Sequence, residues 1–130
     1  MAQSSNVPGE DDRERAERET SARRVLIESG AGKLPRPPWL HPAQPLSSTD
    51  LVHFTIWREG TSEDDVLAAL TLLPAMRAEV EQLETALVFT ARVQGLSWGR
   101  IARAMGLGSA QAALQRFERL SSRIEPRQRT

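Results

Sequence analysis

Cysteine is absent from the 130 residues, which excludes disulfide bonds, iron–sulfur clusters, thiol nucleophiles and thiolate zinc sites. The chain also lacks an apolar run of the roughly 18 residues that a membrane-spanning helix needs, and its N-terminus has no apolar signal region. We therefore expect a cytoplasmic protein without a membrane segment. The length suits one domain with tails and is short for an enzyme with two lobes around a cleft.

Residues that build catalytic or metal sites are scarce. His41 and His53 are the only histidines, and they stand 12 residues apart with no metal-ligand spacing around them. The segment 30–33, Gly-Ala-Gly-Lys, resembles part of a phosphate-binding loop, but Ile27 takes the place of the upstream glycine and Leu34 that of the magnesium-binding hydroxyl residue. We expect no enzyme activity, no metal and no cofactor.

The formal net charge is zero, but the charge is unevenly distributed. Residues 1–85 hold 9 Lys or Arg against 15 Asp or Glu, whereas residues 86–130 hold 8 Arg against Glu118 and Glu125. A basic C-terminal third indicates an anion-binding region, and nucleic acid is the commonest large anion. The alternative is a solvated helical surface of ordinary charge.

The first third of the chain has little apolar material. Residues 1–33 predict a mostly disordered tail, within which 13–29 can form a short helix ended by Gly30 and Gly32. Five prolines between residues 35 and 45 predict an extended strap or linker over 34–48. Trp39 and Leu40 would anchor this strap on the folded body or on a partner.

The segment 49–59 fits two kinds of secondary structure. Val52, Phe54 and Ile56 alternate as in a strand, while Leu51, Phe54 and Trp57 also fit one face of a helix capped by Thr49 or Asp50. We prefer the helix because nothing else in the sequence predicts a strand, and an unpaired strand is unstable.

A long leucine-rich helix is expected within a helical core or dimerisation region over residues 49–94. Ser62 is a suitable N-cap and is followed by an acidic first turn. Pro74 either kinks this helix or lies in the first turn of a second helix that follows one ending near Leu72. Apolar residues recur at heptad spacing and predict a seam that packs inside the molecule or forms a homodimer. The seam residues are Val66, Ala69, Leu73, Met76, Val80, Leu83, Leu87 and Thr90.

Residues 95–124 predict two short helices around a glycine turn. Gly95 ends the long helix, Ser97 caps the next one, and Ser109 caps the last. Ala102, followed four residues later by Gly106 and then by an apolar residue, is typical of a helix-turn-helix. The buried stripe of the last helix is expected to contain Ala113, Phe117, Leu120 and Ile124.

In a DNA-binding helix-turn-helix the second helix enters the major groove, where its outward N-terminal residues meet base edges. Glutamine pairs with adenine through two hydrogen bonds, and arginines on both helices contact phosphates. The basic tail, 125–130, would add non-specific attraction. The predicted base-reading residues are Ser109, Ala110, Gln111, Leu114 and Gln115, and the predicted phosphate-contacting residues are Arg100, Arg103, Arg116, Arg119 and Arg123.

The span from about Asp65 to Leu120 resembles small actinobacterial helix-turn-helix DNA-binding proteins, some of which are described as transcriptional regulators of a small heat-shock protein. The resemblance rests on Leu-Ser-Trp-Gly-Arg-Ile-Ala, Met-Gly-Leu-Gly-Ser and Gln-Ala-Ala-Leu-Gln-Arg-Phe-Glu-Arg-Leu. It implies DNA binding and transcriptional control. Such proteins tend to carry Ser-Arg-Gln-Ala-Ala where this chain has Ala110 after Ser109, a departure that weakens readout of guanine.

The sequence thus predicts an all-α protein that binds specific duplex DNA as a nucleoid-associated regulator. A homodimer is expected because one such module reads few bases. Two alternatives remain. In the first, the heptad helix with Trp39 and Trp57 docks a partner protein. In the second, the protein coats DNA with little sequence preference.

Overall fold

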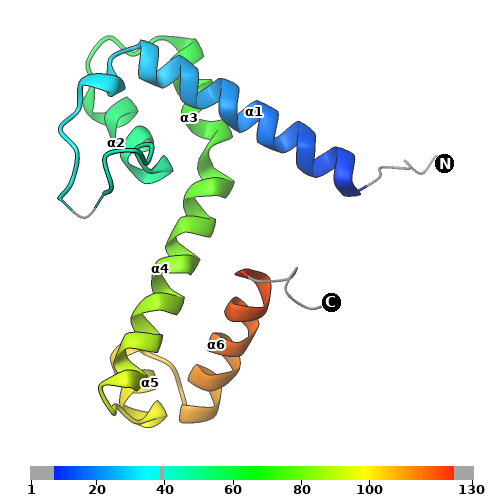
Figure 1. The fold of residues 1–130 in the computed structure, drawn as a ribbon, viewed down its shortest axis with the longest axis vertical. Helices are drawn as coiled ribbons and strands as arrows, with labels where there is room; N and C mark the ends of the chain where they lie inside the picture. Colours follow the sequence, from blue (N-terminus) through cyan, green and yellow to red (C-terminus); the bar gives the residue numbers. More distant parts are fainter. Residues whose placement is uncertain (1–7, 39, 125–130) are drawn as a thin grey trace. The chain divides into compact units, whose positions relative to one another are not determined.

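A computed structural model of the chain describes residues 8–38 and 40–124, and all regular secondary structure in that part is helical. The prediction of an all-α protein is therefore confirmed. The chain forms two compact units, Met1–Arg77 and Ala78–Thr130, whose boundary lies inside a helix. The elements are α1 (Pro8–Glu28), the short 3-10 helix η1 (Ala31–Lys33), α2 (Ser48–Trp57), α3 (Glu63–Thr71), α4 (Leu73–Val93), α5 (Trp98–Met105) and α6 (Ala110–Ile124) (Figure 1).

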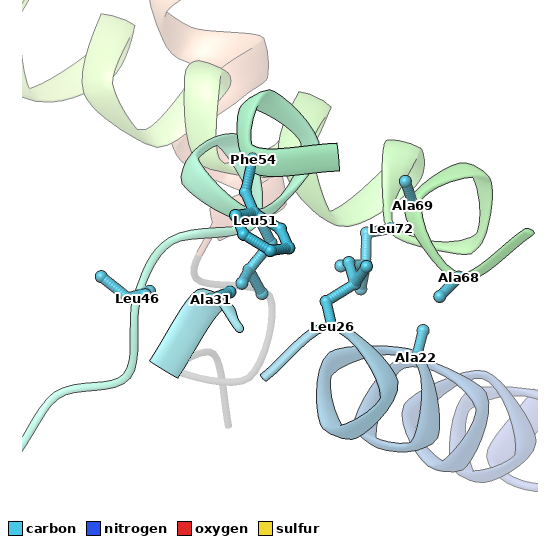
Figure 2. Close-up of a cluster of buried hydrophobic side chains, with 9 residues drawn as sticks. All are labelled: Ala22, Leu26, Ala31, Leu46, Leu51, Phe54, Ala68, Ala69 and Leu72. Atoms are coloured by element: carbon cyan, nitrogen blue, oxygen red, sulfur yellow. The ribbon is translucent and has the colours of Figure 1, made fainter. Parts of the chain in front are cut away.

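The core of the first unit lies between α1, α2 and α3. Figure 2 shows Ala22 of α1 facing Ala68 of α3, with Leu26 and Leu72 next to this pair. Alanines at the crossing let the two helix backbones approach closely, so that both leucines are completely buried. The other buried members of this core are Ala31, Leu46, Leu51, Phe54 and Ala69.

Helix α1 covers most of the short helix that the sequence allows over 13–29, and it begins earlier, at Pro8, within the segment predicted to be mostly disordered. Most of its residues between 11 and 20 are exposed, so little local burial favours order there. Order comes instead from the far end of the helix, where Ala22 and Leu26 enter the core and Arg23 donates hydrogen bonds to the carbonyl oxygen of Leu46 and to Ser48. Residues 1–7 of the predicted tail lie outside the described residues.

The proline-rich strap, residues 34–48, packs against the core of the first unit to which it belongs. Leu46 is buried in the core, and Leu40 packs against it at the position where the sequence predicts an anchor. The predicted anchoring by Trp39 lies outside the described residues, as do the basic tail 125–130 and the side chain of Ile124.

The preferred helix over 49–59 is confirmed as α2, but its cap is different. Ser47 is the N-cap and accepts a hydrogen bond from the backbone N–H of Asp50 at 3.0 Å, so neither Thr49 nor Asp50 caps the helix. Leu51 and Phe54 face the core, whereas Trp57 is three-quarters exposed.

The leucine-rich segment forms two helices rather than one kinked helix. Ser62 caps α3 as predicted, and α3 ends at Thr71. After Leu72, α4 begins with Pro74 in its first turn, where the missing N–H costs no helical hydrogen bond. The heptad series is therefore divided between α3 and α4. Its members on α3 are Val66 and Ala69, and those on α4 are Leu73, Met76, Val80, Leu83, Leu87 and Thr90.

Candidate nucleic-acid interface

The turn between α5 and α6 is set by backbone chemistry that the sequence predicts. Gly106 ends α5 in the left-handed region, with φ 76° and ψ 21°. Leu107 then donates a backbone hydrogen bond to the carbonyl oxygen of Ala102 at 2.8 Å, which satisfies an open helix end. Ser109 starts α6 by accepting from the N–H of Ala112 at 3.1 Å. These bonds fix where α6 begins relative to α5.

The junction between α4 and α5 uses the same devices. Gly95 has φ 90°, and the N–H of Leu96 bonds to the carbonyl oxygen of Ala91 at 3.0 Å. Ser97 caps α5 through the N–H of Arg100 at 3.1 Å. The predicted roles of Gly95 and Ser97 are thus confirmed.

A small core joins α4, α5 and α6. Val88, Ile101, Ala102 and Ala113 are its buried members. The rings of Trp98 and Phe117 close one side, with centroids 5.7 Å apart and planes tilted by 52°. The guanidinium of Arg92 lies 5.0 Å from the centre of the Trp98 ring, a favourable cation–π distance. This packing holds α6 on a fixed support.

The outward face of α6 carries most of the predicted base-reading side chains. Ser109, Ala110, Gln111 and Gln115 are exposed, and the two glutamines stand one helical turn apart. Leu114 is only half-exposed and lies at the edge of this face. Glu118, which was not among the predicted site residues, is exposed three residues after Gln115 and therefore shares the face.

The five predicted phosphate-contacting arginines fall into two groups. Arg100 and Arg103 on α5 and Arg119 on α6 are exposed and make no ion pair within the described residues. Arg116 and Arg123 on α6 instead bind carboxylates of α4. A phosphate contact by either of this second pair stays a prediction, and it would compete with the carboxylate.

Two ion pairs connect α6 to α4. Arg116 binds Glu84 through two parallel hydrogen bonds, from Nε to Oε2 and from Nη2 to Oε1, the second at 2.9 Å. Arg123 contacts both carboxylate oxygens of Glu81 through Nη1, at 3.0 and 2.9 Å. Neither glutamate could be predicted from the sequence, because their partners are 32 and 42 residues away along the chain.

The Glu84 pair alters the ionisation of both partners. Hydrogen bonding to Arg116 lowers the pKa of the Glu84 carboxyl group although burial of that group acts in the opposite direction. The same contact raises the pKa of Arg116. Near neutral pH the two side chains are therefore held as an ion pair, and Glu84 contributes little net negative charge to this surface.

Comparison with protein-family models, curated proteins and solved structures found no match for this chain. Across residues 8–38 and 40–124, no helix combines the length and apolar character that crossing a membrane requires. Over the same residues, no three His, Asp or Glu side chains are grouped so as to hold a metal ion.

Proposed function

We propose that the protein binds duplex DNA through a helix-turn-helix made of α5 and α6 and acts as a transcriptional regulator. The observation that carries the proposal is the exposed start of α6. There Gln111 and Gln115 project from a helix held in place by a glycine turn, a serine cap and a packed core. Amide side chains at this position have the donors and acceptors to read adenine in the major groove.

The charges around α6 favour an approach to phosphates. Arg100, Arg103 and Arg119 are exposed on the two helices and provide positive charge on their surface. Glu81 and Glu84, two carboxylates of α4, are each bound to an arginine, whereas Glu118 stays exposed on the same face as Gln115 and opposes the approach of phosphates there. We assign phosphate contacts to the three exposed arginines first, because they need not break an ion pair to reach the backbone.

Regulation of a specific gene requires more than one such module. A single helix reads few base pairs, so useful specificity comes from two half-sites bound by a dimer. We therefore include a homodimer in the proposal. In this arrangement the sequence of each half-site is read through Gln111 and Gln115.

Fluorescence anisotropy tests the DNA-binding proposal directly. The purified protein is titrated onto duplex DNA from upstream of its own gene and onto shuffled DNA of equal length, across a salt series. We expect a slope of log affinity against log salt of about −3 to −5, since several phosphates are contacted. Tighter binding to the natural duplex supports a regulator, and equal binding supports a DNA-coating protein. Absence of binding at low salt would contradict both.

An apolar groove in the first unit favours a second candidate function, docking of a partner protein. Side chains of α2 and α3 line a cavity of about 480 Å³. Ile56 and Leu70 on its rim are largely exposed. Under this alternative, Leu70→Glu abolishes binding of the partner protein, while removal of the α5 and α6 arginines leaves that binding unchanged. The DNA proposal gives the opposite pattern for the arginines.

A further inference from the structure

The second unit has more large apolar side chains exposed than fully buried, although Trp98, Leu107 and Phe117 are half-buried against its core. Among its described residues, the large buried ones are Val88, Ile101 and Leu120. Six are exposed, and five of these lie on α4. A unit this small needs its apolar residues to form a core, so a surface of this kind indicates a missing partner. The exposed residues on α4 are Val80, Leu83, Leu87, Phe89 and Val93.

Three of these side chains form one stripe along α4. Val80, Leu83 and Leu87 are spaced by three and four residues, which places them on one face of the helix. Their exposed fractions are 52, 69 and 70%. We call these three residues the α4 stripe.

The α4 stripe is separate from the face that packs on α5 and α6. Each stripe residue is followed directly by a residue of that other face: Val80 by Glu81, Leu83 by Glu84, and Leu87 by Val88. Successive residues of an α-helix are rotated by about 100°, so the stripe and the packed face point in different directions. A second molecule can therefore contact the stripe while α6 stays in place.

We propose that the α4 stripe packs against the α4 stripe of a second copy of this chain. Charge favours this occupant. Between residues 80 and 91 the only charged side chains are Glu81 and Glu84, and each is neutralised by an arginine of its own α6. Two identical helices can thus meet along this stretch without like-charge repulsion. A strongly charged partner would find no side chain of opposite charge here with which to pair. The heptad spacing also suits packing against an identical helix.

This inference deepens the proposed function by naming the surface that brings two DNA-binding helices together. It rests on the proposed function for its biological purpose only. Its test is the mass of the protein in solution without DNA, so failure to dimerise and failure to bind DNA are separate results.

Sedimentation equilibrium of the full chain over a wide concentration range tests the proposal. We expect the wild type to approach twice the monomer mass of 14.4 kDa. Leu83→Glu and Leu87→Glu should sediment as monomers, because each places two like charges in the paired stripe. The control Gln82→Glu adds the same charge at an exposed position on another side of α4 and should remain dimeric.

Circular dichroism of each variant shows whether the helices are intact, and Leu87→Gln repeats the test without added charge. Monomeric stripe variants with wild-type helicity, beside a dimeric Gln82→Glu, support the proposal. A wild type that stays monomeric at every concentration overturns it. A dimer that survives both glutamate substitutions also overturns it and places the contact elsewhere.

Discussion

In the proposed function, Gln111 is the residue that would most directly read a base. Its side chain is exposed at the start of the helix. Replacing it with alanine removes an amide that can form two hydrogen bonds with adenine, so we expect Gln111→Ala to lower discrimination at one base pair by about 1–3 kcal/mol. Competition anisotropy with duplexes changed one position at a time measures this loss. Gln82→Ala, an exposed glutamine on α4, is the matched control and should leave the preference unchanged. An unaltered preference in Gln111→Ala would remove this residue from base reading.

Glu84 gives the second unit a stability that depends on pH. Because its folded-state pKa lies below the ordinary value of 4.5, the stabilisation is fully present above that value. It is lost as the pH falls through the lower folded-state pKa, where the carboxylate takes up a proton. Both partners are partly exposed to solvent, which limits the contribution of the pair.

We expect Glu84→Gln to lower the free energy of unfolding at neutral pH by about 1 kcal/mol. The difference from wild type should shrink on acidification, because both proteins then carry a neutral side chain at this position. Urea denaturation followed by circular dichroism at several pH values provides the measurement. Glu118→Gln serves as the control, since this glutamate is exposed and makes no ion pair within the described residues. Equal stability of Glu84→Gln and wild type at neutral pH would show that the pair contributes nothing.

The turn that ends α5 depends on a backbone conformation that favours glycine. At Gly106 an added Cβ would meet no atom within 4 Å, so the cost of Gly106→Ala comes from its φ of 76° alone. We expect this substitution to destabilise the second unit by about 1–2 kcal/mol. Gly108→Ala is a close control, because its surroundings are equally open and its φ lies outside the left-handed region. Urea denaturation of the two variants should therefore separate them. Equal stability would mean that the turn relaxes into another conformation.

Several helix ends could be predicted from sequence because their causes are local, although the cap of α2 is Ser47 and not Thr49 or Asp50. Ser62, Ser97 and Ser109 each bond an N–H three residues later, and Gly95 and Gly106 supply a positive φ. These interactions need no distant partner. For the same reason the sequence predicts the two short helices between 95 and 124 and the glycine turn that separates them.

Features that depend on distant contacts could not be predicted in this way. The order of α1 comes from Ala22 and Leu26 meeting Ala68 and Leu72, while most of its own residues from 11 to 20 are exposed. The break at Leu72 left two alternatives open because Pro74 is compatible with both a kink and a helix start. The ion pairs between arginines of α6 and carboxylates of α4 likewise leave no signal in the sequence. Only the structure therefore shows which of the predicted phosphate-contacting arginines are already paired.

At the scale of the whole molecule, the proposed attraction to DNA would depend on where charge lies rather than on its total. The chain has no net charge, and most of its acidic residues precede residue 86. Long-range attraction should therefore be weak, and local contacts by exposed arginines should decide the affinity. Such contacts release counterions from DNA, and each contributes about 0.9 to the slope of log affinity against log salt.

We expect Arg100→Ala with Arg103→Ala to reduce the magnitude of that slope by about 2. Affinity should fall most at low salt, where counterion release contributes most, and the wild-type and variant curves should converge as salt is added. The control is a double variant of α1, Arg13→Ala with Arg24→Ala, which removes two exposed arginines. It changes the net charge by the same amount and so shows the effect of net charge alone. If the α1 variant lost as much slope as the α5 variant, total charge rather than α5 would account for binding. If the slope changed only in the α5 variant, the phosphate contacts would lie on the helix that precedes α6, as the proposed docking requires.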